Sequence, residues 1–411
     1  MPNTDTMEFI RAHADDDVRQ LALQMVRFPG VEATFALEQI AGRQKARTKL
    51  PAWAAVEDMV YPPHLSMEQC SSEQTARYKG AVARRLLGGY TEVLDGSNAF
   101  VDLTGGFGVD FYFMAKALQD LPFFIDFRAC YVEQQAHLCE AARHNFARLG
   151  MDCAQVTCAN GVETLRLMPA AVLIYLDPAR RNEHGNKTYA IEDCTPNVLQ
   201  IEELLVQKAE YVLIKLSPML DWHKAVNDLK HVVEVHIVSV GNECKELLFV
   251  LRRTPANTVQ VYCENDGHQF VFPYRVHGSA TTAVCAAQPL ENKWLYEPNA
   301  SIMKGGCFAQ LCQTYALKAL APNSHLFIAD AELPYFPGRG FQITAVSTMN
   351  KKELRRMLAG ISQANIAVRN FPLSVAELRK RLKLKDGGAH YLFAGTDAVG
   401  NHLLLLCRKV L

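Results

Sequence analysis

The chain has no excess of charge of either sign and no long apolar run. Its 411 residues include 43 lysines and arginines and 43 aspartates and glutamates, so its formal net charge at pH 7 is zero. This balance argues against non-specific polyanion binding by the whole molecule but leaves room for a local basic face. No apolar stretch approaches the roughly 20 residues that span a bilayer. Residues 1–18 are acidic and do not resemble a signal peptide.

Paired cysteine motifs are also missing. None of the 12 cysteines forms a Cys-x-x-Cys pair, and the pairs Cys153/Cys158 and Cys307/Cys312 are five residues apart, a poor spacing for zinc. The cysteines sit inside apolar segments, so we expect reduced thiols, no metal site and a cytoplasmic protein.

The order of apolar patterns predicts an α/β protein with appended modules. Residues 5–95 have helical periodicity. Strand and helix signals then alternate over residues 98–254, with strands expected at 99–103, 129–132, 154–158, 172–176, 211–216, 233–240 and 247–252. Only six residues separate the last two strands, which requires an antiparallel connection. We expect a parallel, Rossmann-like sheet of seven strands with helices on both faces, closed by a hairpin.

The pattern changes after residue 254. A hairpin is expected around Asn265-Asp266-Gly267, followed by a helical segment over 298–320. From residue 342 the expected order is strand, helix, strand, helix, strand, strand, with a capping box at Ser374-x-x-Glu377. This part therefore predicts small α+β domains.

Residues 100–110 form the most informative stretch. They read Phe-Val-Asp-Leu-Thr-Gly-Gly-Phe-Gly-Val-Asp, an apolar strand ending in Asp102, then a glycine-rich turn that opens an apolar helix. Such a turn lets backbone N–H groups approach a nucleotide-like ligand closely. Glycine turns can also serve packing alone. The residues at the ends of the following strands therefore decide the interpretation.

Polar residues follow the next three strands as well. Glu133 ends the second strand, where a carboxylate can accept both hydroxyls of a ribose. Asn160-Gly161 follows the third strand and could read an adenine edge. Asp177-Pro178 ends the fourth, above the place expected for the reactive end of a ligand. Four such sites in order favour ligand binding over four unrelated helix caps.

On these motifs, residues 76–254 resemble a class I S-adenosylmethionine-dependent methyltransferase. The usual first motif is Asp-x-Gly-x-Gly-x-Gly; here Thr104 stands where the first glycine is common. The form Asp-x-Thr-x-Gly-x-Gly-x-Asp resembles bacterial ribosomal RNA guanine-N2 methyltransferases in particular. The resemblance implies that S-adenosylmethionine is held by Asp102, Thr104, Gly105, Gly106, Gly108, Asp110, Glu133, Asn160 and Gly161. A dinucleotide-binding dehydrogenase fits less well, because that fold typically carries Gly-x-Gly-x-x-Gly and this loop does not have that spacing.

The fourth motif departs from the family pattern. Enzymes that methylate exocyclic base amines usually carry Asp/Asn-Pro-Pro followed by an aromatic residue, and this chain has Asp177-Pro178-Ala179-Arg180-Arg181. The Asp177 carboxylate and the Pro178 carbonyl can still hold an amine, so we expect these two residues to be catalytic. The stacking aromatic is absent, and we expect substrate contacts from Arg180, Arg181 and Tyr189. Arginines in such a loop can equally be solvated charges.

The C-terminal region resembles domains attached to RNA-modifying enzymes. Residues 351–385 contain ten basic and two acidic side chains, the footprint of a phosphate-binding face or of a solvated helix surface. From residue 342 the order of elements resembles a THUMP-like module, and the segment around Trp294-Leu295-Tyr296 resembles the ferredoxin-like linker domain that accompanies it. We therefore expect substrate-binding residues at Lys351, Arg355 and Lys380.

These expectations divide the chain into four parts. They are an N-terminal helical region (1–75), a class I methyltransferase domain (76–254), a ferredoxin-like linker domain (255–338) and a THUMP-like domain (339–411). The leading hypothesis is methylation of a base nitrogen in transfer or ribosomal RNA. The alternatives are a protein or small-molecule methyltransferase, and an inactive RNA-binding protein that retains the donor fold.

Overall fold

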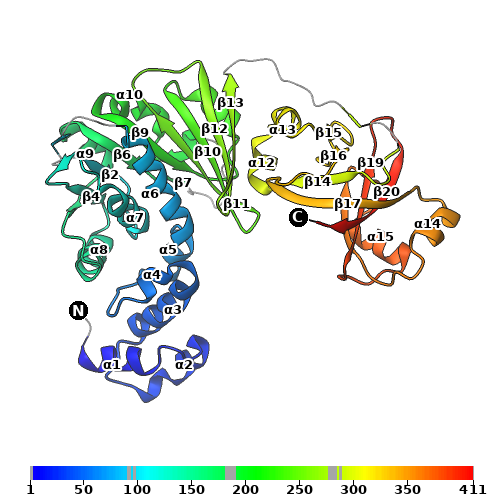
Figure 1. The fold of residues 1–411 in the computed structure, drawn as a ribbon. Helices are drawn as coiled ribbons and strands as arrows, with labels where there is room; N and C mark the ends of the chain where they lie inside the picture. Colours follow the sequence, from blue (N-terminus) through cyan, green and yellow to red (C-terminus); the bar gives the residue numbers. More distant parts are fainter. Residues whose placement is uncertain are drawn as a thin grey trace. The chain divides into compact units, whose positions relative to one another are not determined.

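The computed structural model describes residues 3–89, 94–95, 99–180, 191–275, 285–286 and 289–410. It divides the chain into two compact units (Figure 1). The first contains residues 1–235 and 246–256, and the second contains residues 236–245 and 257–411. No helix in these described ranges is both long enough and apolar enough to cross a membrane.

The first unit begins with a helical region. Its elements are α1 (Thr4–Ala12), α2 (Val18–Gln24), η1 (Met25–Arg27), α3 (Ala33–Lys49), α4 (Pro51–Ala54) and α5 (His64–Gln69). Phe9, Leu21, Ala36 and Ile40 form a small core among α1, α2 and α3. Figure 1 shows these helices leading into α6 (Glu73–Leu87), which packs against α7 (Val109–Leu118). The two helices approach closely, since a Cβ on Gly80 would lie 2.7 Å from the Phe113 carbonyl oxygen.

The expected helical periodicity ends before residue 95. Leu94–Asp95 is a short strand, β1, which pairs in parallel with β3 (Phe124–Ile125). Two residues are too few for a hydrophobic period to be visible in the sequence.

The parallel sheet has the predicted architecture. Its strands lie in the order β5-β4-β2-β6-β9, that is β5 (Ala154–Cys158), β4 (Ala129–Glu133), β2 (Phe100–Asp102), β6 (Ala171–Leu176) and β9 (Ala209–Leu216). The helices between and after them are α7, α8 (Ala136–Arg148), α9 (Gly161–Leu167), α10 (Val198–Lys208) and α11 (Trp222–Asp228). This order, with β2 in the middle, is that of a doubly wound α/β sheet.

A hairpin closes the sheet, as predicted. The strand β11 (Glu243–Leu251) pairs antiparallel with β9, and β10 (Val232–Val240) lies on its other side. The sheet continues to β12 (Thr258–Asn265) and β13 (His268–Arg275), which pair around the expected turn at Asp266-Gly267. Among the described residues it therefore has nine strands and not the expected seven, because this hairpin joins the main sheet instead of a separate module. The short β7 (Ala179–Arg180) pairs with β8 (Cys194–Thr195) outside this sheet, and η3 (Ile191–Asp193) precedes β8.

The second unit contains a seven-stranded sheet in the order β15-β16-β14-β17-β20-β19-β18. The strands are β14 (Trp294–Pro298), β15 (Lys318–Ala319), β16 (Phe327–Ala329), β17 (Gly338–Ser347), β18 (Asn365–Arg369), β19 (His390–Thr396) and β20 (His402–Lys409). Along β20, Leu403 and Leu405 face one core while Leu404 and Leu406 face another. The helices α14 (Lys351–Met357) and α15 (Val375–Leu382) cover the second core, and α15 begins with the predicted capping box.

The single helix expected over residues 298–320 is wrong. The structure has two helices, α12 (Ala300–Gly305) and α13 (Phe308–Tyr315), followed by β15. Gly306, with a φ of +66°, ends α12 in the left-handed conformation, and Ala316 ends α13 in the same way. The apolar period runs on through both helices, so it does not reveal the break.

Candidate active site

The glycine-rich loop after β2 is pressed against β4. The N–H of Gly105 donates to the Val132 carbonyl over 2.8 Å. A Cβ on Gly105 would lie 2.2 Å from the Tyr131 ring, and Gly108, at a φ of +87°, would place one 2.8 Å from Phe146. The Tyr131 hydroxyl in turn donates to the carbonyl of Gly106. A side chain at Gly105 or Gly108 would therefore push the loop away from β4 and α8.

Gly106 is the most open position of the loop. Its φ is +55°, and the nearest atom to a built Cβ is the Thr104 carbonyl oxygen at 3.8 Å. Glu133, which is buried at the end of β4, holds this residue: its Oε2 accepts from the Gly106 N–H over 3.0 Å. Its Oε1 accepts from the Gln135 N–H over 2.9 Å. Glu133 thus fixes the loop to the β4–α8 turn, and its remaining lone pairs can serve a ligand.

Thr104 connects the ends of β2 and β6. Its N–H donates to Asp102 Oδ1 over 2.9 Å, and its hydroxyl oxygen accepts from the Asp177 N–H over 2.6 Å. Burial raises the pKa of the Asp102 carboxyl well above its usual range. The departure from glycine at position 104 therefore supplies a hydrogen bond that glycine cannot make. This link was not predicted, because nothing local in the sequence relates residue 104 to residue 177.

Asn160 caps a helix at the end of the third strand. Its Oδ1 accepts from the N–H groups of Val162 and Glu163, over 2.9 and 3.2 Å, which begins α9. A Cβ on Gly161 would lie 2.2 Å from the Leu103 carbonyl oxygen, so the start of α9 sits directly against the loop after β2. The side-chain carbonyl of Asn160 is occupied as a cap, and its amide group remains exposed for a ligand.

Asp177 is paired with a lysine that was not among the predicted site residues. Lys215 Nζ, on β9, lies 2.6 Å from Asp177 Oδ2. Its side chain is 14% exposed and that of Asp177 is 38% exposed. The one visible signal is a lysine near the end of an otherwise apolar strand, since residues 211–216 read Tyr-Val-Leu-Ile-Lys-Leu.

A buried polar cluster lies behind this pair. Asp110 Oδ2 accepts from the hydroxyls of Ser71 and Tyr175, over 2.9 and 2.8 Å. Its Oδ1 lies 3.2 Å from Lys79 Nζ, and Lys79 also binds Glu246 at 2.6 Å. Burial opposes ionisation of Asp110, but Lys79, Lys215 and the two hydroxyls outweigh it and lower its pKa. Asp110 therefore anchors α7 from within the core.

The N-terminal region docks on the glycine-rich loop. The Trp53 ring meets the Phe107 ring edge-on at 5.0 Å between centroids. Val60 and Asn145 exchange two hydrogen bonds of 2.8 Å, which join the segment after α4 to α8. This region is therefore a part of the site's framework, and no sequence motif indicated that contact.

Some predicted substrate residues lie elsewhere. Arg181 and Tyr189 fall outside the described residues, while the backbone of Arg180 pairs with Cys194. The other three belong to the second unit, where Lys351 and Arg355 are located on α14 and Lys380 is exposed on α15.

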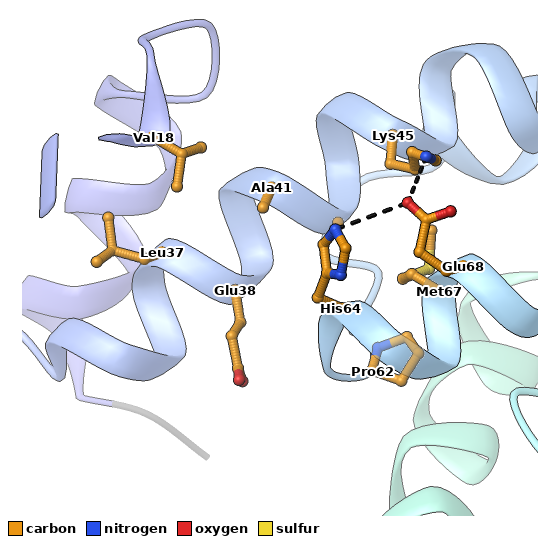
Figure 2. Close-up of a pocket in the computed structure, with 10 residues that line it drawn as sticks. Val18, Leu37, Glu38, Ala41, Lys45, Pro62, His64, Met67 and Glu68 are labelled. Atoms are coloured by element: carbon orange, nitrogen blue, oxygen red, sulfur yellow. Dashed lines mark hydrogen bonds and ion pairs between the residues drawn. The ribbon is translucent and has the colours of Figure 1, made fainter. Parts of the chain in front are cut away.

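A separate cavity of about 190 Å³ lies in the N-terminal region (Figure 2). Its apolar lining includes Val18, Leu37 and Met67, and Glu68 bridges Lys45 and His64 at its rim. None of the strand-end residues lines it. The cavity therefore does not coincide with the predicted chemistry.

The Thr104 link makes a stability prediction. Thr104→Val keeps the side chain's shape but leaves the Asp177 N–H without its acceptor, so we expect a loss of about 1–3 kcal/mol in unfolding free energy. Thr104→Ser keeps the hydroxyl and is the matched control. Urea unfolding of the two variants measures the difference, and equal losses would show that the hydroxyl contributes nothing.

Comparison with protein families identifies two C-terminal domains. Residues 294–337 match a ferredoxin-like domain, and residues 338–409 match a THUMP domain-like family. A search of curated proteins gave no match.

Solved structures include one that aligns along nearly the whole chain. It is the "putative methyltransferase" from Porphyromonas gingivalis W83, with 31% sequence identity, 99% of this chain and 98% of that chain covered, and a TM-score of 0.82. A SAM-dependent methyltransferase from Agrobacterium tumefaciens aligns with 14% identity over 47% of this chain and 65% of that one, with a TM-score of 0.31. An rRNA methylase from Streptococcus thermophilus aligns with 13% identity over 44% and 96%, with a TM-score of 0.29.

At such low TM-scores the last two likenesses carry no weight for this chain, whereas the first is close and complete. Its 31% identity over nearly the full length of both chains shows that the two proteins belong to one family. The chain belongs to the methyltransferase family of the Porphyromonas gingivalis protein, a class I methyltransferase fold followed by ferredoxin-like and THUMP-like domains.

Proposed function

We propose that this protein transfers a methyl group from S-adenosylmethionine to a base nitrogen of transfer or ribosomal RNA. The observation that carries the proposal is the hydrogen-bonded path from Glu133 through the glycine-rich loop and Thr104 to Asp177. The Glu133 carboxylate, which we propose for the ribose, lies at one end of this path, and the Asp177 carboxylate, which we propose for the amine, lies at the other. Both lie at the carboxyl edge of one parallel sheet, where such folds bind ligands.

The loop has the features that the donor needs. Gly105 lets the loop pack against the Tyr131 ring, Gly161 lets α9 begin against the Leu103 carbonyl, and Gly106 leaves open space in the loop for a ligand. Glu133 lies beside Gly106 with free lone pairs for the ribose hydroxyls. When bound, the donor supplies a methyl group on a sulfonium, which already carries its leaving group.

The acceptor corner is built from Asp177 and Pro178. Asp177 Oδ1 and the Pro178 carbonyl can accept the two N–H groups of an exocyclic amine, which directs the nitrogen lone pair at the methyl group. Lys215 already holds the other carboxylate oxygen of Asp177. The residues of this chain therefore orient the acceptor nitrogen and exclude water, which together supply much of the acceleration for such a transfer.

The C-terminal helices support RNA as the substrate. Seven basic side chains lie on α14 and α15, and Arg379 is paired with Asp386. Within the described part of the chain the other six form no ion pair: Lys351, Lys352, Arg355, Arg356, Lys380 and Arg381. Cations on two helices that cover the same core attract phosphates. The match of this segment to a THUMP domain-like family points the same way.

Donor binding depends on Glu133 in this proposal. We expect Glu133→Ala to weaken S-adenosylmethionine binding by roughly tenfold or more, because the ribose loses its acceptor and the loop loses its anchor. Titration calorimetry measures the effect. Glu163→Ala, which removes a carboxylate from the first turn of α9, is the matched control. Absence of donor binding by the wild-type protein would contradict the proposal.

Methyl transfer depends on Asp177. With radiolabelled S-adenosylmethionine and total RNA from cells that lack the gene, the wild-type protein should label one modified nucleoside after digestion. Asp177→Ala should lower the rate by roughly 100-fold or more while the donor still binds, because the nitrogen loses its orientation. Label in protein rather than RNA would favour a protein methyltransferase. Donor binding without any transfer would favour an inactive RNA-binding protein.

RNA binding depends on the basic helices α14 and α15. Replacing Lys351, Arg355 and Lys380 together by glutamine in the full chain should weaken binding of that RNA. The slope of log affinity against log salt should also become shallower, by about 0.7–0.9 for each phosphate that these side chains no longer neutralise. Lys293→Gln removes a cation that is already paired with Asp330 and is the control. An unchanged salt slope would remove this surface from the proposal.

A further inference from the structure

We propose that Lys215 is a positioning residue that fixes and neutralises the Asp177 carboxylate, so that the acceptor corner takes a neutral N–H group rather than a protonated amine. This inference rests on the proposed function and narrows its substrate class. It is carried by the geometry of two neighbouring strand ends and by the buried charges behind them.

Strand pairing places the two residues level. The strands β6 and β9 run parallel with Leu176 opposite Ile214, so the next residues in each strand, Asp177 and Lys215, emerge side by side. Lys215 Nζ reaches Asp177 Oδ2 at 2.6 Å. The lysine is the more buried partner, and the carboxylate extends further toward solvent. Among the described residues no partner is found for Asp177 Oδ1, so this oxygen can receive a substrate.

Lys215 remains an ammonium at this position. Burial opposes its charge, but the carboxylates of Asp177, Asp110 and Glu246 outweigh burial and raise its pKa. Lys215 therefore cannot serve as a general base near neutral pH. Its effect on a substrate passes through the carboxylate that it holds.

The other carboxylates of the cluster have a different cation. Lys79 binds both oxygens of Glu246, at 2.6 and 2.7 Å, and lies 3.2 Å from Asp110. Asp177 is thus the carboxylate to which Lys215 is bound at hydrogen-bond distance. The titratable groups that interact with Asp177 or Lys215 come from several elements: Asp102 (β2), Asp110 (α7), Tyr175 (β6), Glu246 (β11), Lys49 (α3) and Cys70 (after α5). Lys79 (α6) acts on this pair through Asp110 and Glu246.

A neutralised carboxylate selects its substrate by hydrogen bonding. A protonated amine that approached Asp177 would also face the Lys215 ammonium, and like charges in a partly buried site repel. A neutral exocyclic amine needs only an acceptor for its N–H. Its nitrogen lone pair forms the new bond to the methyl carbon, the electrons of the breaking carbon–sulfur bond pass to sulfur, and one nitrogen proton then leaves to solvent past Asp177.

Three variants test this role: Lys215→Met, Lys215→Arg and the double variant Lys215→Met/Asp177→Asn. Without Lys215, Asp177 loses the cation bound to its carboxylate while Asp102, Asp110 and Glu246 remain, so its pKa should rise. As the pH falls, protonation then turns one of its two acceptor oxygens into an O–H donor. With total RNA from cells that lack the gene, Lys215→Met should lower kcat by about 10–100-fold, with less effect on KM, and shift the acid limb of the rate profile to higher pH.

The companion variants separate positioning from folding. Lys215→Arg should keep much of the rate. The double variant should recover about tenfold over Lys215→Met, because an asparagine amide is neutral and still accepts an N–H. Lys208→Met removes another part-buried lysine, one that bonds to the Met168 carbonyl, and controls for the loss of a buried cation. Loss of rate without a pH shift and without recovery in the double variant would overturn the inference.

Two further measurements keep the inference separate from the proposed function. Carboxyl carbon-13 resonances of aspartate, with Asp177 assigned from Asp177→Asn, should show a higher pKa for Asp177 in Lys215→Met even if no RNA is methylated. An unchanged pKa would overturn the pairing. Wild-type protein should transfer methyl groups to that RNA and not to poly-lysine, and transfer to poly-lysine at a comparable rate would overturn the preference for a neutral acceptor.

Discussion

A fully buried ammonium group ties the first unit together. Lys79, on α6, is inaccessible to solvent. Its charge is compensated by Glu246 on β11 and Asp110 on α7. Removing one partner of a buried pair typically costs about 3–5 kcal/mol, because the remaining charge stays buried and unpaired. The packing of α6, α7 and the β10–β11 hairpin against one another therefore depends on the Lys79 side chain. The active-site edge rests on this cluster through Asp110, Tyr175 and Lys215.

The parts of the fold that follow from local pattern could be predicted. Apolar strands ending in Asp102, Glu133 and Asp177 indicated a parallel sheet and the edge where its polar residues meet. The structure confirms that sheet and its closing hairpin. Turn and cap signals near Asp266 and Ser374 were equally reliable, because a few neighbouring residues determine such structures.

The parts that were missed depend on residues far apart in the sequence. Lys215 reads as an isolated lysine in an apolar strand, and only strand pairing shows that it meets Asp177. The docking of Trp53 on Phe107 likewise joins two segments without a shared motif. The break at Gly306 was missed for a different reason: the apolar period continues across it, and a glycine near a helix end is only a weak signal.

The Thr104 hydroxyl has a consequence for how strongly two bound ligands would influence each other. It accepts from the backbone of Asp177 while the Thr104 N–H is held by Asp102, so the loop and the acceptor corner share one rigid connection. Under the proposed function, a ligand that tightened the loop would also order the corner, and by thermodynamic reciprocity a ligand at the corner would strengthen binding at the loop by the same factor. A chain with glycine at position 104 would lack this bond, and its two half-sites would be free to fill independently.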